Sequence, residues 1–354
     1  MASSGSPTEA QSLGAPGLQA SVVIPTHNRR DSLQRTLLAI ARQGLSTERF
    51  EVLVICAGCT DGTVHMCHEI SPDLPYRLRV IEQSNTGLAA ARNRGVEEAL
   101  AQLIVFLNDD VIPEPALLAT HIRAHNARLN LVTFGPLLSP PDQAFSVWDE
   151  WENSAALKQY QVIARGVSRA TERLFSTGNA AVKKRHLIDA GGFHPDFRRA
   201  EDRELAIRLS ELELSFDYLP EARAVRYISL SFADWLKLPL QDAEDDVLLA
   251  RAGYPQTLRL VAEEFPSRSL RVRTLVRVCA GHRGRMRAAE RSLTKRILRA
   301  NEERQARGRG LAACGMLYYL GYYHHITTLL GGPGKFKNFL RTRDVKAALA
   351  APTR

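Results

Sequence analysis

The sequence predicts an α/β protein built on a parallel sheet with helices on both faces, followed by a basic helical region. The first observation is that short β-branched and apolar runs alternate with segments of helical periodicity between Ala20 and about Ala127. Nearly continuous apolar strands in such an alternation are typical of a sheet buried on both faces. The second observation is charge. Residues 251–354 hold 22 Lys/Arg and 6 Asp/Glu, a net charge of +16, whereas residues 1–250 hold 25 and 32, a net charge of −7.

Length and composition narrow the class of protein. The chain has 354 residues, of which 45% are hydrophobic and 24% charged, and this usage excludes a collagen-like, coiled-coil or wholly disordered chain. The five cysteines are scattered and odd in number, which favours reduced thiols and a cytoplasmic protein. The first residues are rich in Ser, Gly and Pro and lack the apolar core of a signal peptide. We expect a flexible tail over residues 1–19, an α/β domain over 20–235 and a basic, mainly helical region over 236–354.

The α/β pattern places the polar residues of the first domain. The expected strands are residues 21–24, 51–56, 78–81 and 103–107, and the expected helices are residues 31–42, 87–100 and 115–128. Polar clusters follow Ile24, Ile55 and Leu107 directly. Because ligands bind outside the carboxyl ends of parallel strands, these clusters mark the expected site. Further along, a short apolar run occurs at residues 131–135, and we expect short strands at residues 215–219 and 224–228 and a helix that begins near Glu201.

Several well-known fingerprints are absent from the sequence, and a different set of motifs is present. There is no G-x-G-x-x-G, Walker, H-E-x-x-H or G-x-S-x-G motif. The motifs present are, in order, Val22-Val23-Ile24-Pro25-Thr26-His27-Asn28-Arg29, Thr60-Asp61-Gly62-Thr63, the stretch Asn85–Gly95, Phe106-Leu107-Asn108-Asp109-Asp110-Val111, and Gly178-Asn179 followed by Gly191-Gly192-Phe193 and Glu201-Asp202.

This ordered set resembles the family 2 glycosyltransferases of GT-A fold over roughly Ala20–Trp235. The resemblance implies a Rossmann-like α/β sheet that is mixed and mostly parallel, with helices on both faces. The resemblance implies a hexosyltransferase-type enzyme that transfers a sugar from a nucleotide-diphosphate sugar to a hydroxyl acceptor. The acceptor would be a polysaccharide, a glycolipid or a glycosylated metabolite. The sequence alone also leaves a second interpretation open, a catalytically silent domain that binds nucleotide or glycan and serves as a scaffold. A nucleotidyltransferase has less support, because no Gly-rich loop follows the first strand.

An acidic cluster ends the strand at 103–107. Hard oxygen ligands in an open crevice suit Mg²⁺ or Mn²⁺, which would bridge a diphosphate and neutralise the leaving group. The cluster matches the family's D-x-D motif, with Asn108 in the place of the first Asp. The resemblance then implies that Asp110 is the metal ligand and that Asn108 and Asp109 face the donor. A plain turn at a strand end is the structural alternative.

A pair of carboxylates opens the helix at Glu201. Acids at a helix start often only offset the helix dipole or cap the helix. The functional alternative is a general base that takes the proton of the acceptor hydroxyl. The resemblance places this base in the Glu-Asp motif, and we assign it to Asp202, with Glu201 as a supporting carboxylate. Attack opposite the leaving group implies inversion at the anomeric carbon.

The remaining predicted site residues also follow from the resemblance. The expected nucleotide-binding residues are Pro25, Thr26, Asn28, Asp61 and Arg92. The expected residues on the donor-sugar and acceptor side are Gly178, Asn179, Gly192 and Phe193. A solvated helix arginine and ordinary core packing are the structural alternatives for Arg92 and Phe193.

Two departures from the family pattern bear on the donor site. Cys56 and Ala57 stand where the family has two acids after the second strand, so the base of the donor nucleotide stays open. Tyr227 stands where the family often has a histidine near the metal, and Arg226 beside it could replace part of the metal's charge. Cys56 and Cys59 also form a C-x-x-C pair, for which a zinc or redox site is a weaker alternative to ordinary loop residues.

The basic region predicts one or two amphipathic helices over residues 268–309 and an uncharged, Tyr-rich helix over 311–330. These helices could pack on the first domain or lie in a membrane interface, cross a membrane, or form a protein–protein surface. We expect a cytoplasmic protein that can bind peripherally to an anionic inner membrane face. Oligomers could form through these helices. A nucleic-acid partner is not expected, because the aromatic residues lie apart from the arginines.

Overall fold

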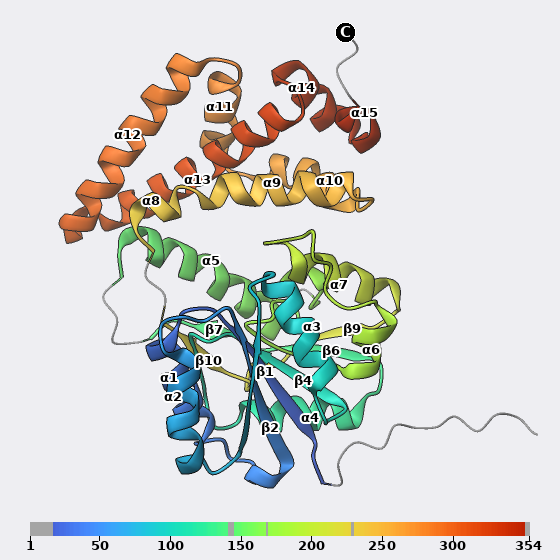
Figure 1. Cartoon of the computed structure of the whole chain (residues 1–354). Coiled ribbons are helices and arrows are strands. Elements are labelled where there is room, and N and C mark those ends of the chain that lie inside the picture. Colours follow the sequence, from blue (N-terminus) through green and yellow to red (C-terminus); the bar gives the residue numbers. More distant parts are fainter. Residues whose placement is uncertain (1–16, 141–144, 168, 228–229, 351–354) are drawn as a thin grey trace, which may run out of the picture. The chain divides into compact units, whose positions relative to one another are not determined.

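The computed structural model describes residues 17–140, 145–167, 169–227 and 230–350. It contains two compact units, one of Met1–Pro140 with Tyr160–Tyr227 and one of Pro141–Gln159 with Ile228–Arg354. We call them the α/β unit and the helical unit (Figure 1). Residues 1–16 of the expected tail lie outside the described residues.

The α/β unit is built on a seven-stranded mixed sheet in the order β3-β2-β1-β4-β8-β6-β9. Strands β1, β2, β3 and β4 run parallel, as do β6 and β9, whereas β8 runs antiparallel to β4 and β6. The fold class expected from the sequence is therefore confirmed. The strands are β1 (Ala20–Thr26), β2 (Phe50–Ala57), β3 (Arg77–Gln83), β4 (Leu103–Leu107), β6 (Leu131–Phe134), β8 (Asn179–Lys183) and β9 (Ser215–Tyr218).

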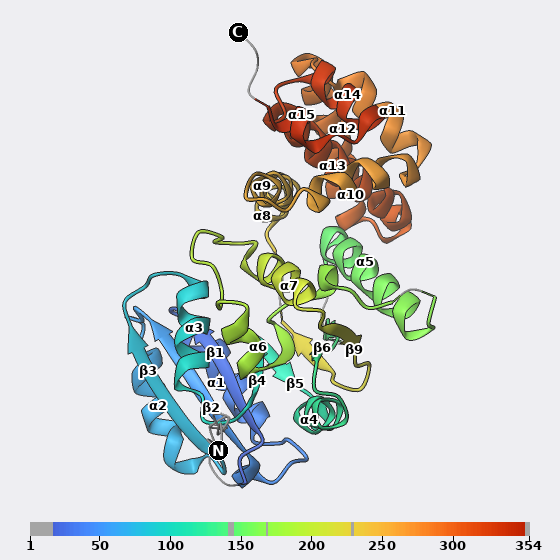
Figure 2. The same cartoon turned by 90° about the vertical axis from the view of Figure 1, so that its right-hand side faces the viewer.

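Helices cover both faces of this sheet (Figures 1 and 2). The strands are apolar on both faces and need cover on each. In β1, for example, Val22 and Ile24 belong to the apolar core on one face and Val23 to the core on the other. Side chains of α1 (Arg30–Ile40), α2 (Thr63–Ile70) and α4 (Leu117–Ala127) complete the first core. Side chains of α3 (Leu88–Glu98), α6 (Lys184–Asp189) and α7 (Glu201–Glu211) complete the second.

A small second sheet lies next to the end of β4. Its strands are β5 (Val111–Pro113), β7 (Leu137–Leu138) and β10 (Ala224–Arg226). Strand β10 pairs antiparallel with β5, and this register sets Arg226 opposite Val111. The basic side chain of Arg226 is thereby held next to Asp110, the residue that precedes β5.

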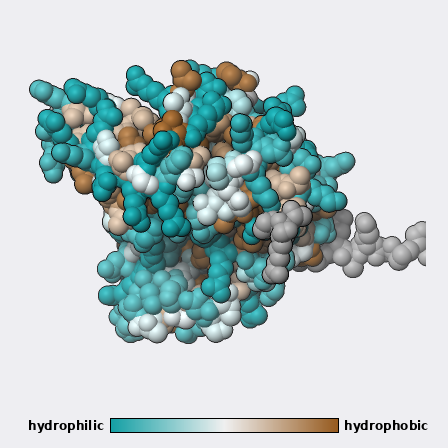
Figure 3. Space-filling model, turned by 90° about the horizontal axis from the view of Figure 1, so that it is seen from above, coloured by the Kyte–Doolittle hydropathy of each residue, from teal (hydrophilic) through white to brown (hydrophobic). Residues whose placement is uncertain are grey.

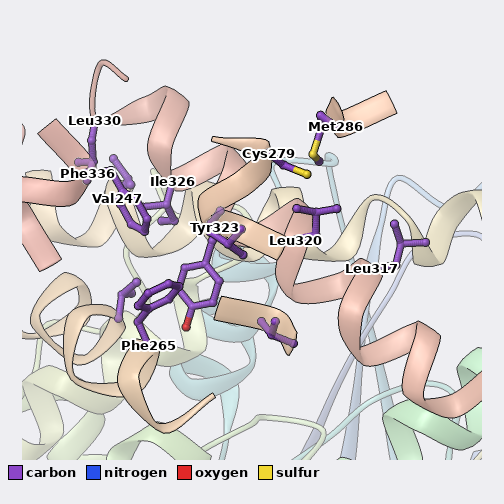
Figure 4. Packing of buried hydrophobic residues seen from close by; sticks show 14 of the residues in the cluster. Val247, Phe265, Cys279, Met286, Leu317, Leu320, Tyr323, Ile326, Leu330 and Phe336 are labelled. Carbon is purple, nitrogen blue, oxygen red and sulfur yellow. The ribbon is translucent and has the colours of Figure 1, made fainter. Parts of the chain in front are cut away.

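The helical unit holds a single cluster of buried apolar residues. Phe265, Leu320, Tyr323 and Ile326 lie in this cluster (Figure 4). Its helices are α5 (Val147–Ala164), whose last turn belongs to the α/β unit, α8 (Phe232–Trp235), α9 (Leu238–Arg251), α10 (Gln256–Glu264), α11 (Leu270–Cys279), α12 (Arg283–Glu302), α13 (Arg307–Leu329), α14 (Pro333–Thr342) and α15 (Val345–Leu349). Single 3₁₀ turns in the chain occur at Thr47–Arg49, Ser71–Asp73, Glu172–Leu174, Phe265–Ser267 and Arg304–Ala306.

The Trp-containing stretch near residue 150 joins the helical unit, which the sequence did not indicate. The rings of Trp151 and Trp235 meet edge to face with centroids 6.0 Å apart, and the indole of Trp148 donates to the carbonyl of Leu230 at 2.8 Å. These contacts explain why the compact units divide the chain at Tyr227, a little before the boundary expected after Trp235.

The uncharged helix expected over residues 311–330 is α13, which contacts α9, α11, α12 and α14. Leu317, Leu320, Tyr323 and Ile326 of this helix are buried in the core of the unit. Its lack of charge is therefore explained by burial. Among the described residues, no helix combines the length and the apolar character that crossing a bilayer requires.

The packing of α3 on β1 predicts that Gly95→Ala destabilises the α/β unit. A Cβ at this position would lie 2.3 Å from Cγ1 of the buried Val23. Alanine favours a helix by about 1 kcal/mol over glycine, but overpacking costs roughly 1–3 kcal/mol or more. We expect a net loss in the free energy of unfolding, measured by urea titration. Gly44→Ala is the control, because its Cβ would make only an ordinary 3.5 Å contact. Equal stability of Gly95→Ala and wild type would contradict the packing.

A buried carboxyl predicts the pH dependence of the helical unit. The pKa of Glu152 is raised from 4.5 to about 7, chiefly by burial and also by the nearby charges of Asp242 and Asp149, while a hydrogen bond from Trp235 acts in the opposite direction. The folded state then keeps a proton that the unfolded state releases, so stability falls as the pH rises from 4.5 to about 7. The loss is up to about 3 kcal/mol.

Glu152→Gln should remove this part of the pH dependence of urea unfolding. Glu302→Gln, an exposed carboxyl of the same unit, serves as control and should leave the slope unchanged. If the slope is the same in Glu152→Gln and wild type, the assignment to Glu152 is wrong.

Candidate active site

A pocket of about 500 Å³ opens in the α/β unit where β1 and β2 end and α3 begins. Pro25 and Thr26, both predicted from the sequence, line it. The other lining residues are His27, Ala57, Asn85, Thr86, Gly87, Leu88, Ala89, Ala91, Pro195, Phe197 and Arg198. His27 and Asn85 lie within motifs noted in the sequence, but neither was singled out. Arg198 belongs to no motif, so nothing in the sequence pointed to it.

Hydrogen bonds connect the loop after β1 to the loop after β2 beside this pocket, and of the residues that make them only His27 and Ala57 line the pocket itself. His27 contacts the carbonyl of Ala57 through Nδ1 at 2.6 Å. The side chain of Asn28, which has a φ of +54°, accepts from the backbone N–H of Thr60 at 2.7 Å. Asp61 accepts from the backbone N–H groups of Arg30 and Thr63, each at 3.1 Å. Asn28 and Asp61 thus hold the loop after β1 against the loop after β2, and their role in nucleotide binding stays a prediction.

The acidic cluster at the end of β4 is connected to the pocket through Thr26. The hydroxyl of Thr26 donates to Oδ2 of Asp109 at 2.8 Å, and the hydroxyl of Thr36 donates to the carbonyl of Asp109 at 3.0 Å. Burial raises the pKa of Asp109, although the Thr26 hydrogen bond and the charge of Arg29 act in the opposite direction. The side chain of Asp109 therefore connects the acidic cluster, to which it belongs, with Thr26, which lines the pocket.

Asp110 is paired with a cation of the protein. Nε of Arg226 lies 3.1 and 3.2 Å from its two carboxylate oxygens, and the Asp110 side chain is only 6% exposed. The described residues contain no group of three or more His, Cys, Asp or Glu placed to hold a metal. Mg²⁺, however, is often bound by one or two carboxylates together with substrate phosphates. A role for Asp110 in such a shared site, in which a diphosphate would supply the other oxygens, stays a prediction.

The predicted base is held by two hydrogen bonds and lies beside a buried arginine. The backbone N–H and the hydroxyl of Thr177 both donate to Asp202, each at 2.9 Å. Nη1 of Arg92 lies 2.8 Å from Oε1 of Glu201 and 3.6 Å from Oδ1 of Asp202. The side chains of Arg92 and Glu201 are 4% and 5% exposed, whereas that of Asp202 is 20% exposed. Asp202 is thus the carboxylate of the pair that solvent or a ligand can reach.

Burial also acts on the protonation of Glu201. It raises the pKa of this carboxyl, and the charge of Asp202 adds to the effect, while the charge of Arg92 opposes it. Arg92 does not line the pocket. Its contacts are those of a buried counterion for the Glu-Asp pair and not those of a solvated helix residue, and its role in nucleotide binding stays a prediction.

The antiparallel register of β4 and β8 joins the two acidic motifs. Leu107 is opposite Asn179, so Asn108 and Gly178 lie side by side, and a Cβ on Gly178 would lie 3.3 Å from Nδ2 of Asn108. Thr177, the neighbour of Gly178, holds Asp202. The structure therefore brings Asn108, Gly178 and Asp202, all predicted from separate motifs, to one edge of the sheet.

Three other predicted residues have mainly structural contacts. The side chain of Asn179 is buried and contacts His121 at 3.1 Å and the carbonyl of Ala222 at 2.7 Å. Phe193 packs edge to face on Phe106, with ring centroids 5.4 Å apart. Gly192 has a φ of +73°, and a Cβ there would lie 2.8 Å from Oδ1 of Asn93. A role for these residues on the sugar side stays a prediction.

The cysteines show no sign of the zinc or redox alternative. All five are free, and burial raises the pKa of Cys67 to about 12 and raises that of Cys56 as well. Such thiols are poor nucleophiles, because the thiolate is the reactive form. Ordinary buried or loop residues are the interpretation that these contacts support.

The comparison with known families identifies the α/β unit. Residues 21–190 match the model of glycosyl transferase family 2. This domain belongs to glycosyl transferase family 2. The uncharacterized glycosyltransferase YfnE of Bacillus subtilis is 27% identical over 246 residues, which cover 56% of this chain and 62% of YfnE. The validoxylamine A glucosyltransferase of Streptomyces hygroscopicus subsp. jinggangensis is 33% identical over 215 residues, 53% of this chain and 50% of that protein. The chain thus spans between about half and three fifths of these relatives.

Solved structures share the fold of this family 2 domain. The mannosyltransferase PcManGT from Pyrobaculum calidifontis, in complex with GDP-Man and Mn²⁺, matches with a TM-score of 0.54 and 18% identity over 88% of this chain and 89% of its own. Residues 1–349 of TarS from S. aureus, in complex with UDP, match with a TM-score of 0.51 and 16% identity over 92% of each chain. At these identities the similarity shows the GT-A fold.

The buried ion pair predicts a large effect of Arg92→Met. Removal of one partner leaves Glu201 buried without a counterion, which costs about 3–5 kcal/mol of stability. The double variant Arg92→Met/Glu201→Gln should recover most of this loss, because it also removes the buried charge. Urea unfolding of both single variants and the double variant measures the coupling. Additive effects of the two substitutions would contradict the pairing of Arg92 with Glu201.

Proposed function

We propose that the family 2 domain is an inverting glycosyltransferase that moves a sugar from a nucleoside-diphosphate sugar to a hydroxyl acceptor. The observation that carries the proposal is the position of Asp202. Its partly exposed carboxylate is held by Thr177 at the sheet edge where the acidic cluster of β4 ends, and that cluster is connected to the pocket through Thr26. A base, an anion-binding region and a nucleotide-sized pocket are the parts that sugar transfer requires.

The pocket suits a nucleoside diphosphate. Its wall includes Leu88 and Ala89 in the first turn of α3, where the positive end of the helix dipole favours phosphate. Arg198 adds a positive charge to the lining. His27, Asn85 and Thr86 offer hydrogen-bonding groups to a base, and no carboxylate lines the pocket. Structural neighbours with the same fold were solved with GDP-Man and with UDP, which supports a nucleotide ligand of this type.

The leaving diphosphate needs positive charge near β4. Asp110, with Asn108 and Asp109 beside it, would hold Mg²⁺ or Mn²⁺ together with the diphosphate. The ion, when bound, would neutralise charge on the departing phosphate. Arg226 already places a guanidinium against Asp110. We expect this guanidinium to share the neutralisation of the leaving diphosphate with the metal ion. Arg226 directly precedes Tyr227, the position at which family members often have a histidine.

Asp202 would take the proton of the acceptor hydroxyl as the oxygen attacks the anomeric carbon. Thr177 donates to both carboxylate oxygens, and the pairing of Glu201 with Arg92 fixes the start of α7 that carries them. One base on the face opposite the leaving group gives inversion. The acceptor is proposed only as a hydroxyl of a glycan, a lipid-linked glycan or a metabolite.

Asp202→Asn should lower turnover by about 10²–10⁴-fold, because the amide cannot accept the proton. Its hydrogen bonds from Thr177 can largely persist, so nucleotide binding should be kept. Turnover is measured as release of nucleoside diphosphate from the nucleotide sugar that thermal-shift titration selects. Glu211→Gln, an exposed carboxyl at the other end of α7, is the matched control and should turn over as wild type does.

The outcomes separate the two functions left open by the sequence. Unchanged turnover in Asp202→Asn would overturn the assignment of the base. Nucleotide binding by the wild type without turnover on any nucleotide sugar tested would instead favour the silent, nucleotide-binding scaffold.

A further inference from the structure

The strongest charge concentration of the chain lies on two helices outside the family 2 domain. Residues 270–299, which include α11 and most of α12, contain ten Lys/Arg and one acidic residue, Glu290. Nine of these ten basic side chains are exposed, and the tenth, Arg273, is half-buried. The apolar residues Met286, Leu293 and Ile297 of α12 are buried. The arginines therefore cover the outer surface of a helix that is anchored by its opposite side.

Few of these charges are neutralised within the protein. Arg299 pairs with Glu303 at 2.9 Å, and the guanidinium of Arg277 lies 5.8 Å from the ring centroid of Phe265. In the part of the chain that the structure describes, the following side chains make no ion pair or hydrogen bond: Arg283, Arg287, Arg291, Lys295 and Arg296. Like charges at this density repel one another, so an anionic surface would relieve the repulsion.

Apolar side chains adjoin this basic surface on α11. Leu270 is 68% exposed and Val278 is 46% exposed, and two helical turns separate them on the same side of α11. Between them lies a groove of about 410 Å³ lined by Leu270, Arg271, Thr274, Leu275, Val278 and Met316. Nη1 of Arg285 lies 3.4 Å from the carbonyl of Val278, so the basic start of α12 adjoins the apolar end of α11.

Figure 3 shows the face of the helical unit that carries α11, α12 and α14. Hydrophilic side chains dominate this face, and apolar ones form small separate spots. A surface with many cations and a few exposed aliphatic side chains has the composition of a helix that lies at a membrane interface.

We propose that α11 and α12 form a docking surface for an anionic phospholipid bilayer. The arginines and Lys295 would bind headgroup phosphates, at about 1 kcal/mol for each basic residue near the surface. Leu270 and Val278 would enter the boundary between headgroups and acyl chains. Nucleic acid fits this surface less well, because residues 270–302 contain no Phe, Tyr or Trp side chain on which bases could stack. The inference does not depend on the proposed sugar transfer.

Co-sedimentation of the full chain with vesicles tests the proposal. The vesicles are phosphatidylcholine alone or phosphatidylcholine with phosphatidylglycerol. Binding is expected only to the anionic vesicles, and it should weaken as salt is raised because exposed charges are screened. The test variant carries glutamine in place of Arg283, Arg287, Arg291, Lys295 and Arg296. It should bind at least about a hundredfold more weakly, since five contributions of about 1 kcal/mol are lost.

A charge-matched control removes the same number and kind of exposed basic residues elsewhere. It carries glutamine in place of Arg42, Arg77, Arg123, Lys158 and Arg165. This control should keep vesicle binding within a few fold of wild type. All substituted side chains are exposed, so circular dichroism and the unfolding midpoint should stay as in wild type.

Three results would overturn the proposal. They are equal binding to neutral and anionic vesicles, equal loss in the test and control variants, and vesicle binding unchanged in the test variant while its binding to an oligonucleotide is lost. The last result would assign the basic surface to nucleic acid. Leu270→Ser/Val278→Ser tests the apolar part separately, and its loss of vesicle binding should persist when the salt concentration changes.

Discussion

The buried ion pair between Arg92 and Glu201 is the interaction on which the candidate site depends. It joins α3, which begins at the pocket, to α7, which carries the predicted base. A buried pair of this kind is not strong evidence for stability, since desolvation of both charges offsets much of their attraction. What it does provide is a fixed position, because neither charge can leave the other without a large cost. Asp202 follows Glu201 directly and lies 3.6 Å from the same arginine, so the ion pair and the hydrogen bonds from Thr177 together set the position of the base.

The rest of the site is built by strand register. The pairing of β4 with β8 sets Asn108 beside Gly178, and the pairing of β10 with β5 holds Arg226 against Asp110. Both pairings bring together residues far apart in the chain, and both meet at the carboxyl end of β4. The acidic cluster of β4 therefore has a protein cation on one side and the threonine that holds the base on the other. This arrangement supports chemistry on an anionic leaving group.

The sequence was sufficient for features set by local patterns. The apolar runs of the first domain predicted β1 to β4, and helical spacing predicted α1, α3 and α4 with ends within a few residues. It was insufficient where a contact depends on tertiary register. Thr177 and Arg198 carry no local signal, and they gain their roles from the loops that fold over the sheet edge. The burial of Arg92 and the packing of Trp151 on Trp235 likewise depend on elements far apart in sequence. The sequence gives the identity of each side chain, but it does not show which distant residue that side chain contacts in the folded protein.

The most direct test of the account is hydrogen–deuterium exchange of the full chain with and without UDP, GDP, dTDP or CDP, each with Mn²⁺ or EDTA. The account predicts that one of these nucleotides slows exchange in the loops that line the pocket, residues 25–28 and 85–91 and the segment around Arg198. Strand β9 and the helical unit should exchange as before. Protection confined to other segments, or no protection by any of the four nucleotides, would contradict the assignment of this sheet edge as a nucleotide site.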